Sequence, residues 1–175
     1  LKRGKPLRRT ADGSPLLRYC VRSALWAVPD LDQGRLVLYL EGFQMVCPLT
    51  EQELSLFVPI LAMALVEQLA QLCGDVGALK EDKVPAEQVG AVFTALRVLS
   101  GAEWTALLER ASQVEQILKQ DPDRHYPKMD EDTRRRYRQQ VCRLAQKYRL
   151  EEGEAANQAL ELARKGEPSR HVGWY

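Results

Sequence analysis

The chain has few of the residues on which common catalytic and metal sites depend. It contains two histidines and four cysteines in 175 residues, and no two cysteines are spaced as C-x-x-C. Closely spaced Cys and His ligands typify zinc sites, so we expect no metal site and no cofactor. The phosphate-binding patterns G-x-x-x-x-G-K-[ST] and G-x-G-x-x-G are absent, as is the nucleophile pattern G-x-S-x-G. We therefore predict no catalytic residues in this piece of chain.

Net charge and long apolar runs are also lacking. Lys plus Arg number 25 and Asp plus Glu 24, so the overall field is too weak to steer the chain to nucleic acid. No uninterrupted apolar run of membrane-spanning length is present, and no signal peptide opens the chain, so we expect no membrane span. The four cysteines lie at apolar helical positions far apart in sequence, and we expect them to be buried, reduced thiols.

Helical periodicity dominates what is present. Apolar residues recur at spacings of three and four, and the connections between the periodic segments are short. This pattern predicts an all-α fold, an irregular antiparallel bundle of about seven helices. The composition of residues 36–40 also suits a strand, but the helical period continues beyond them. The expected helices are 15–28, 32–47, 50–73, 86–99, 102–120, 131–148 and 152–165.

Start and stop signals support these segments. Ser14 before Pro15 and the single residues Asp32 and Asp130 are good N-caps, because their side-chain oxygens can accept the free N–H groups of a first helical turn. Thr50 and Glu53 have the spacing of a capping box. Further signals are Pro59, which predicts a kink or break, and Gly74 and Gly166, which predict helix ends.

The same signals predict how the chain is divided. Residues 1–14 are basic at their start, and we expect a flexible N-terminal arm. Residues 15–74 form a first helical subdomain in this interpretation. Residues 75–85 lack a sustained apolar period and predict a loop or linker. Residues 86–175 form a second helical subdomain packed on the first.

The junction near Asp121 is the most distinctive part of the chain. Arg134 and Arg138 share a helix face, where guanidinium groups can bind a carboxylate or phosphate in bidentate fashion, and tyrosines nearby can stack on sugar rings. The alternative is structural: the arginines pair with Asp121, Asp130 or Glu115, and Tyr137 of the expected helix 131–148 lies in the core. The terminal aromatic pair can mark an interface. The candidate binding residues are Arg134, Arg138, Tyr126, Tyr137, Trp174 and Tyr175.

Three stretches carry a resemblance to one family. The first runs from Tyr39 to Leu65 and includes Gln44, Pro48, Leu49, Thr50, Glu53, Leu54, Pro59 and Leu61. The second comprises Leu96, Arg97, Trp104, Ser112, Val114, Glu115, Leu118, Asp121, Pro122, Tyr126, Met129, Asp130, Thr133, Arg134, Tyr137 and Arg138. The third is the terminal run 171–175. In this order, the three stretches resemble an internal region of the cyclic β-1,2-glucan synthases, which are large bacterial membrane glycosyltransferases.

The resemblance implies a role for the whole protein and for this piece. The parent is then a membrane-embedded glycosyltransferase of carbohydrate metabolism, and this piece is a non-catalytic helical accessory or scaffold domain before the glycosyltransferase module. Its partners are other modules of the same polypeptide and, in addition, glucan. Its location is the cytoplasmic face of the bacterial inner membrane. The chain begins without Met and ends within a motif, which is typical of a piece of a longer protein.

Two other functions stay open at this point. A free-standing interaction module can read an acidic peptide, nucleic acid or glucan with residues 134–138 and the basic N-terminal arm. A catalytic fragment acting on sugar nucleotides is the third interpretation. Steep salt dependence of binding would identify the interaction module, and turnover of a nucleotide sugar would identify the catalytic fragment.

Overall fold

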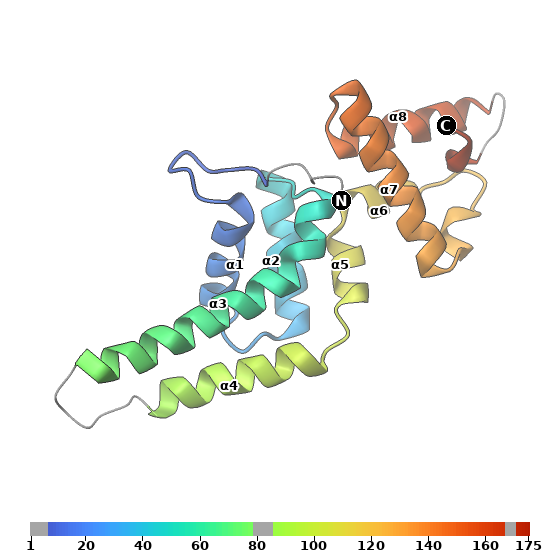
Figure 1. Ribbon diagram of the computed structural model, residues 1–175. Coiled ribbons are helices and arrows are strands. Elements are labelled where there is room, and N and C mark those ends of the chain that lie inside the picture. Colours follow the sequence, from blue (N-terminus) through green and yellow to red (C-terminus); the bar gives the residue numbers. More distant parts are fainter. Residues whose placement is uncertain (1–6, 79–85, 167–170) are drawn as a thin grey trace. The chain divides into compact units, whose positions relative to one another are not determined.

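The protein is all-α, as predicted. The computed structural model describes residues 7–78, 86–166 and 171–175, with 75–78 and Trp174 described in backbone only, and this part contains no β-strand (Figure 1). An isolated bridge joins Arg9 and Pro15. The helices are α1 (Leu16–Ala27), α2 (Gln33–Val46), α3 (Glu51–Ala78), α4 (Ala86–Gly101), α5 (Thr105–Ala111), α6 (Gln113–Leu118), α7 (Glu131–Tyr148) and α8 (Glu152–Lys165), with 3-10 turns η1 (Tyr126–Lys128) and η2 (Val172–Trp174).

Three of the predicted helix starts are confirmed by hydrogen bonds. Asp32 accepts the N–H of Arg35 at 2.9 Å, and Asp130 caps α7 in the same way. At the start of α3, the Thr50 N–H donates to the Glu53 carboxylate at 2.9 Å while the Glu53 N–H donates to the Thr50 hydroxyl, a complete capping box. These caps need only neighbouring residues, so the sequence is sufficient to locate them.

One predicted helix is two helices. Residues 102–120 were expected to form one helix, but α5 ends at Ala111 and α6 begins at Gln113. Ser112 adopts an extended conformation between them, and its hydroxyl accepts the N–H of Glu115 at 3.0 Å. A serine that bonds the following turn competes with continuation of the preceding helix, which explains the break.

Helix α3 is longer than predicted. It runs through Pro59 without dividing. It also continues through Gly74 to Ala78, because a helical glycine costs only about 1 kcal/mol relative to alanine and does not end a helix by itself. Residues 79–85 of the predicted loop lie outside the described residues. The part Glu51–Gly74 is long and apolar enough, by length and composition alone, to cross a membrane, and 17% of its most apolar window is buried. Cys73 is exposed, contrary to expectation.

The described part of the basic N-terminal arm forms a turn. The Thr10 N–H donates to the Ser14 carbonyl at 2.8 Å, and Gly13 adopts the left-handed conformation, with φ 82°, that such a turn requires. The cap of α1 is Pro15 and not Ser14, which is held by this turn, and no side-chain cap bond is made. Residues 1–6 lie outside the described residues.

The chain forms two compact units that differ from the predicted subdomains. The first unit consists of Leu1–Cys47 and Ser55–Leu107, and the second of Pro48–Leu54 and Leu108–Tyr175. The first turn of α3 therefore belongs to the second unit, and the whole of α4 belongs to the first. A division at residues 75–85 was expected because that stretch lacks apolar period, but the buried α4 residues Val92, Ala95 and Leu99 place α4 with the preceding helices.

Each unit has an apolar core of its own. In the first unit, α1 and α2 pack side by side (Figure 1), and the core is built from aliphatic side chains such as Leu17, Leu36 and Leu40 with Phe57 from α3. In the second unit, α8 packs on α6 and α7. The apolar core there is formed by Val114, Ile117, Leu118, Tyr126, Val141, Ala156, Leu160, Ala163 and Val172.

Candidate functional site

A buried ionic cluster in the second unit contains the two arginines singled out from the sequence. Arg134 and Arg138 lie one turn apart on α7, so both side chains leave the helix on the same face. Three glutamates meet them: Glu51 from the first turn of α3, Glu109 from α5 and Glu115 from α6. All of these residues belong to the second unit. We call this group the ionic cluster.

Glu115 is the centre of the ionic cluster. Its side chain is fully buried, and one carboxylate oxygen accepts hydrogen bonds from Arg138 Nη1 and, at 2.6 Å, from the Tyr126 hydroxyl. The other oxygen lies 3.4 Å from Lys119 Nζ and 3.4 Å from Arg134 Nε. A buried carboxylate is stable only when its charge is matched, and three cations surround this one.

The remaining acids complete the pairing of the arginines. Arg134 Nη2 donates to both oxygens of Glu109, at 2.6 and 2.8 Å. Arg138 Nε lies 3.2 Å from Glu51 Oε2, and the other oxygen of Glu51 accepts the Ser112 hydroxyl. Glu51 thus joins the start of α3 to α7 and to the break between α5 and α6.

Burial perturbs the acid–base properties of the ionic cluster. Desolvation raises the pKa of Glu51, and the Ser112 hydroxyl and Arg138 only partly oppose it. Desolvation and the bond to Glu115 raise the pKa of Tyr126 well above its ordinary value, so its phenol stays protonated and acts as a donor. Desolvation lowers the pKa of Arg138, but Glu115 and Glu51 overcome it and leave that pKa raised. The arginines are therefore permanent cations held by internal acids.

A second polar cluster holds the C-terminal segment of the described chain. Asp121 is buried and accepts the backbone N–H of Val172 at 2.9 Å, that of Tyr126 at 3.1 Å and the His171 ring nitrogen Nδ1 at 3.1 Å. Burial by itself raises the pKa of Asp121, but these donors outweigh it and lower that pKa. His171 Nε2 lies 3.1 Å from the Tyr137 hydroxyl. The result is a continuous Asp121, His171 and Tyr137 chain of hydrogen bonds.

The structure brings the candidate binding residues together but gives most of them internal partners. Arg134 and Arg138 pair with glutamates. The structural alternative predicted Glu115, Asp121 or Asp130 as their partners. Glu115 is a partner of both arginines, whereas Asp121 and Asp130 are not among the partners shown. Tyr126 is fully buried, and Tyr137 is half-buried, with its ring 5.7 Å from that of Tyr126. The rest of the set lies at the C-terminus: Tyr175 is half-buried against the core, and the Trp174 side chain lies outside the described part.

Sequence reasoning missed Glu51, Glu109 and Ser112. Each had a sufficient local explanation, because Glu51 stands in a helix first turn and Glu109 and Ser112 fell inside a predicted helix. The usable signal was the charge balance of α7, whose clustered arginines exceed the nearby acids and need partners from elsewhere in the chain. Among residues 7–78, 86–166 and 171–175, no group of three or more His, Cys, Asp or Glu side chains is arranged to hold a metal ion.

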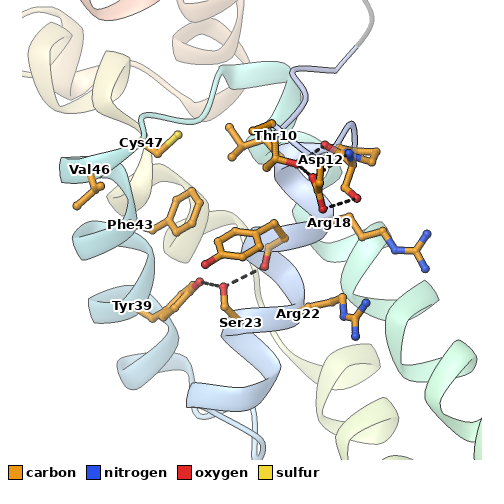
Figure 2. Close-up of a pocket in the computed structure, with 14 residues that line it drawn as sticks. Thr10, Asp12, Arg18, Arg22, Ser23, Tyr39, Phe43, Val46 and Cys47 are labelled. Carbon is orange, nitrogen blue, oxygen red and sulfur yellow. Dashed lines mark hydrogen bonds between the residues drawn. The ribbon is translucent and has the colours of Figure 1, made fainter.

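A groove in the first unit is a separate feature. It has a volume of about 1030 Å³ and lies between α1 and α2, beside the turn of residues 10–14 (Figure 2). Tyr19, Tyr39, Phe43 and Val46 line it. The Tyr39 hydroxyl bonds to Ser23 and to the Cys20 carbonyl, and burial raises the pKa of Tyr39 to about 12. Polar and charged residues line the groove too, among them Asp12, Arg18 and Arg22, so it combines an aromatic wall with polar groups.

No family model, curated protein or solved structure matches the chain. The resemblance to cyclic β-1,2-glucan synthases thus stays a prediction from the residues that carry it.

Proposed function

We propose that the chain is a non-catalytic helical scaffold domain that docks or orients neighbouring modules of a cyclic β-1,2-glucan synthase-like glycosyltransferase. The observation that supports this is the ionic cluster. Arg134 and Arg138, the residues best suited to capture an acidic ligand, are already paired with Glu51, Glu109 and Glu115. Their chemistry is then used to fix helices and not to bind substrate.

Rigid attachment of the C-terminal segment gives the proposal a mechanism. Asp121 holds both the backbone of Val172 and the ring of His171, and a side chain added at Gly173 would overlap the Tyr137 ring, with a Cβ only 2.2 Å from its Cε1. A segment held at three points leaves the second unit in a defined direction. In a longer protein, such an anchor orients whatever is attached, which is what a scaffold between modules has to do.

The docking surface of this proposal lies on the second unit. Tyr148 of α7 and Leu162 of α8 are 60% and 41% exposed, and they are the large apolar side chains that this unit presents to solvent among the described residues. Exposed aromatic and aliphatic residues are the usual anchors of a protein interface. We therefore place the module contact at these two residues.

The experiment is a titration of the chain, in lipid-free buffer, with the separately expressed soluble modules of its parent and with short β-1,2-glucans in parallel. Saturable binding to a module that is lost in the double variant Tyr148→Ser and Leu162→Ser, but kept in Arg135→Ala, is the expected result. Glucan binding without module contact would replace the scaffold by carbohydrate recognition. Absence of both would overturn the proposal in favour of a free-standing interaction module.

A further inference from the structure

Large apolar side chains are exposed on the first unit in unusual number. Among the described residues, eight of the ten large hydrophobic side chains that face solvent belong to this unit. Soluble proteins tolerate single exposed apolar residues, but a concentration of them in one region marks a binding surface. The eight are Tyr19, Trp26, Leu38, Met45, Val46, Met63, Val66 and Phe93.

Five of these residues form one face over α1 and α2, which we call the outer apolar face. Tyr19 and Trp26 are seven residues apart on α1, and Leu38 and Met45 are seven apart on α2, so each pair lies along one side of its helix, opposite the buried residues. Val46 completes the face. Tyr19 and Val46 line the same groove, which makes the faces of the two helices continuous.

Three members of this face are exposed over most of their surface. Trp26, Met45 and Val46 are each 88% exposed. Tryptophan is favoured where an apolar ring meets a polar boundary, because its N–H keeps a partner while the ring leaves water. The face thus combines a strong apolar drive with a residue type suited to a lipid headgroup region.

Arginines border the outer apolar face on α1, whereas on α2 Glu41 lies one turn from both Leu38 and Met45. Residues 7–28 contain four arginines and a single acid, Asp12. Figure 2 shows Arg22 on the side of α1 that is turned away from Phe43 and Val46, so this cation flanks the apolar surface instead of interrupting it. Cations beside an exposed apolar and aromatic face complement an anionic surface.

Helix α3 exposes further apolar surface in the same unit. Its part Glu51–Gly74 is apolar enough for a bilayer, yet only 17% of its most apolar window is buried, and Met63 and Val66 are 58% and 55% exposed. Crossing the bilayer is disfavoured because Glu51 is tied to Arg138 and Ser112, and Glu67 bonds to Arg18 at 2.8 Å. Charged groups held in this way suit a helix that contacts a membrane surface without entering it end-on.

We propose that the first unit binds the surface of anionic lipid bilayers through the outer apolar face, with Arg22 meeting the headgroups. Charge complementarity selects an anionic over a neutral surface, and apolar residues spread over several helices suit a bilayer, which needs no matching shape. This binding is separate from the proposed scaffold function, which concerns the second unit.

The experiment measures co-flotation of the whole chain with large unilamellar vesicles of phosphatidylcholine alone or mixed with phosphatidylglycerol. We expect binding to the mixed vesicles that weakens as salt is added, because exposed charges are screened. The double variant Trp26→Ser and Met45→Ser should bind at least about tenfold more weakly, since two largely exposed apolar side chains can no longer enter the lipid. Arg22→Glu should weaken binding to mixed vesicles about fivefold or more and should not change binding to neutral vesicles.

The control is Tyr148→Ser, which removes a 60% exposed apolar residue from the second unit and should bind vesicles as the unaltered chain does. Circular dichroism confirms that each variant keeps its helices. Failure of the unaltered chain to float with mixed vesicles overturns the proposal, as does an equal loss in Tyr148→Ser. Salt-sensitive binding to soluble polyglutamate without vesicle binding would assign the outer apolar face to an acidic protein partner. The vesicle assay contains no module of the parent protein, so a negative result in it does not bear on the scaffold proposal.

Discussion

The two units place their polar and apolar side chains in opposite ways. Among the described residues, the buried polar or charged side chains are Glu53, Ser112, Glu115, Asp121 and Arg138, and all five belong to the second unit. The first unit has an apolar core and keeps most of the exposed large hydrophobic residues. Buried ion pairs add little net stability but allow few alternative arrangements. The comparison suggests that the second unit is built for a defined internal geometry, whereas the first is built to leave apolar surface available.

The largest expected effect breaks the ionic cluster. Arg138→Ala leaves Glu115 and Glu51 buried without their main cation, and removal of one partner of a buried pair costs about 3–5 kcal/mol of unfolding free energy. Urea denaturation measures the loss, and hydrogen exchange should show it in the second unit. The control, Arg135→Ala, removes an exposed arginine paired with Asp132 on the same helix and should change stability by less than about 0.5 kcal/mol. Equal effects of the two variants would contradict the buried role of Arg138.

The corresponding change in the first unit is apolar. Leu40 is fully buried, and Leu40→Ala should cost about 3 kcal/mol through lost transfer energy and a cavity. Because no charge is involved, the loss should be the same at low and high salt, unlike losses in the ionic cluster. Leu38→Ala, at a position 66% exposed on the same helix, is the control and should be nearly silent in urea denaturation. A salt-dependent effect of Leu40→Ala would remove the contrast between the units.

A smaller effect is expected at Asp121. Asp121→Asn weakens the acceptor shared by Val172, Tyr126 and His171, and we expect a loss of about 2 kcal/mol. Hydrogen exchange of the Val172 amide should be faster in this variant. Asp123→Asn, at an exposed position, should leave that exchange unchanged.

The pH dependence of Asp121 follows from its lowered pKa. The unfolded chain takes up this proton at higher pH than the folded protein, so the contribution of Asp121 is present above the unfolded pKa, about 3.9, and is lost as pH falls through the lower folded pKa. Asp121→Asn should therefore flatten the acid side of the stability profile. An unchanged profile would show that the donors do not stabilise the carboxylate.

Glu51 should give the smallest effect, with the opposite sign in pH. Its folded pKa is raised by burial, so the folded protein keeps this proton to higher pH than the unfolded chain does. Stability from this group is present below the unfolded pKa, about 4.3, and is lost as pH rises through the folded pKa. Urea denaturation of Glu51→Gln should no longer show that decline above about pH 4. A steeper decline in the variant would contradict the assignment.

The fold was predictable where one neighbouring residue decides the outcome. Asp32, Asp130 and the Thr50 and Glu53 box start helices by bonds that reach three residues, and Gly166 ends α8 in the left-handed conformation, with φ 77°. The break at Ser112 was missed because the apolar period continues across it. The same hydroxyl accepts from Glu115 and donates to Glu51, and the second bond joins residues 61 apart in sequence.

The sequence by itself determined the class of the protein, because helical period, caps and glycine stops depend on contacts within a few residues. Only the tertiary structure decided what the singled-out residues do. It paired Arg138 with acids from α3 and α6, buried Tyr126 beside them, and left Trp26 and Met45 in solvent although their helices carry apolar residues on both sides. The reason is physical: a side chain's environment depends on segments distant in sequence, and no local pattern records which of two apolar faces will be covered.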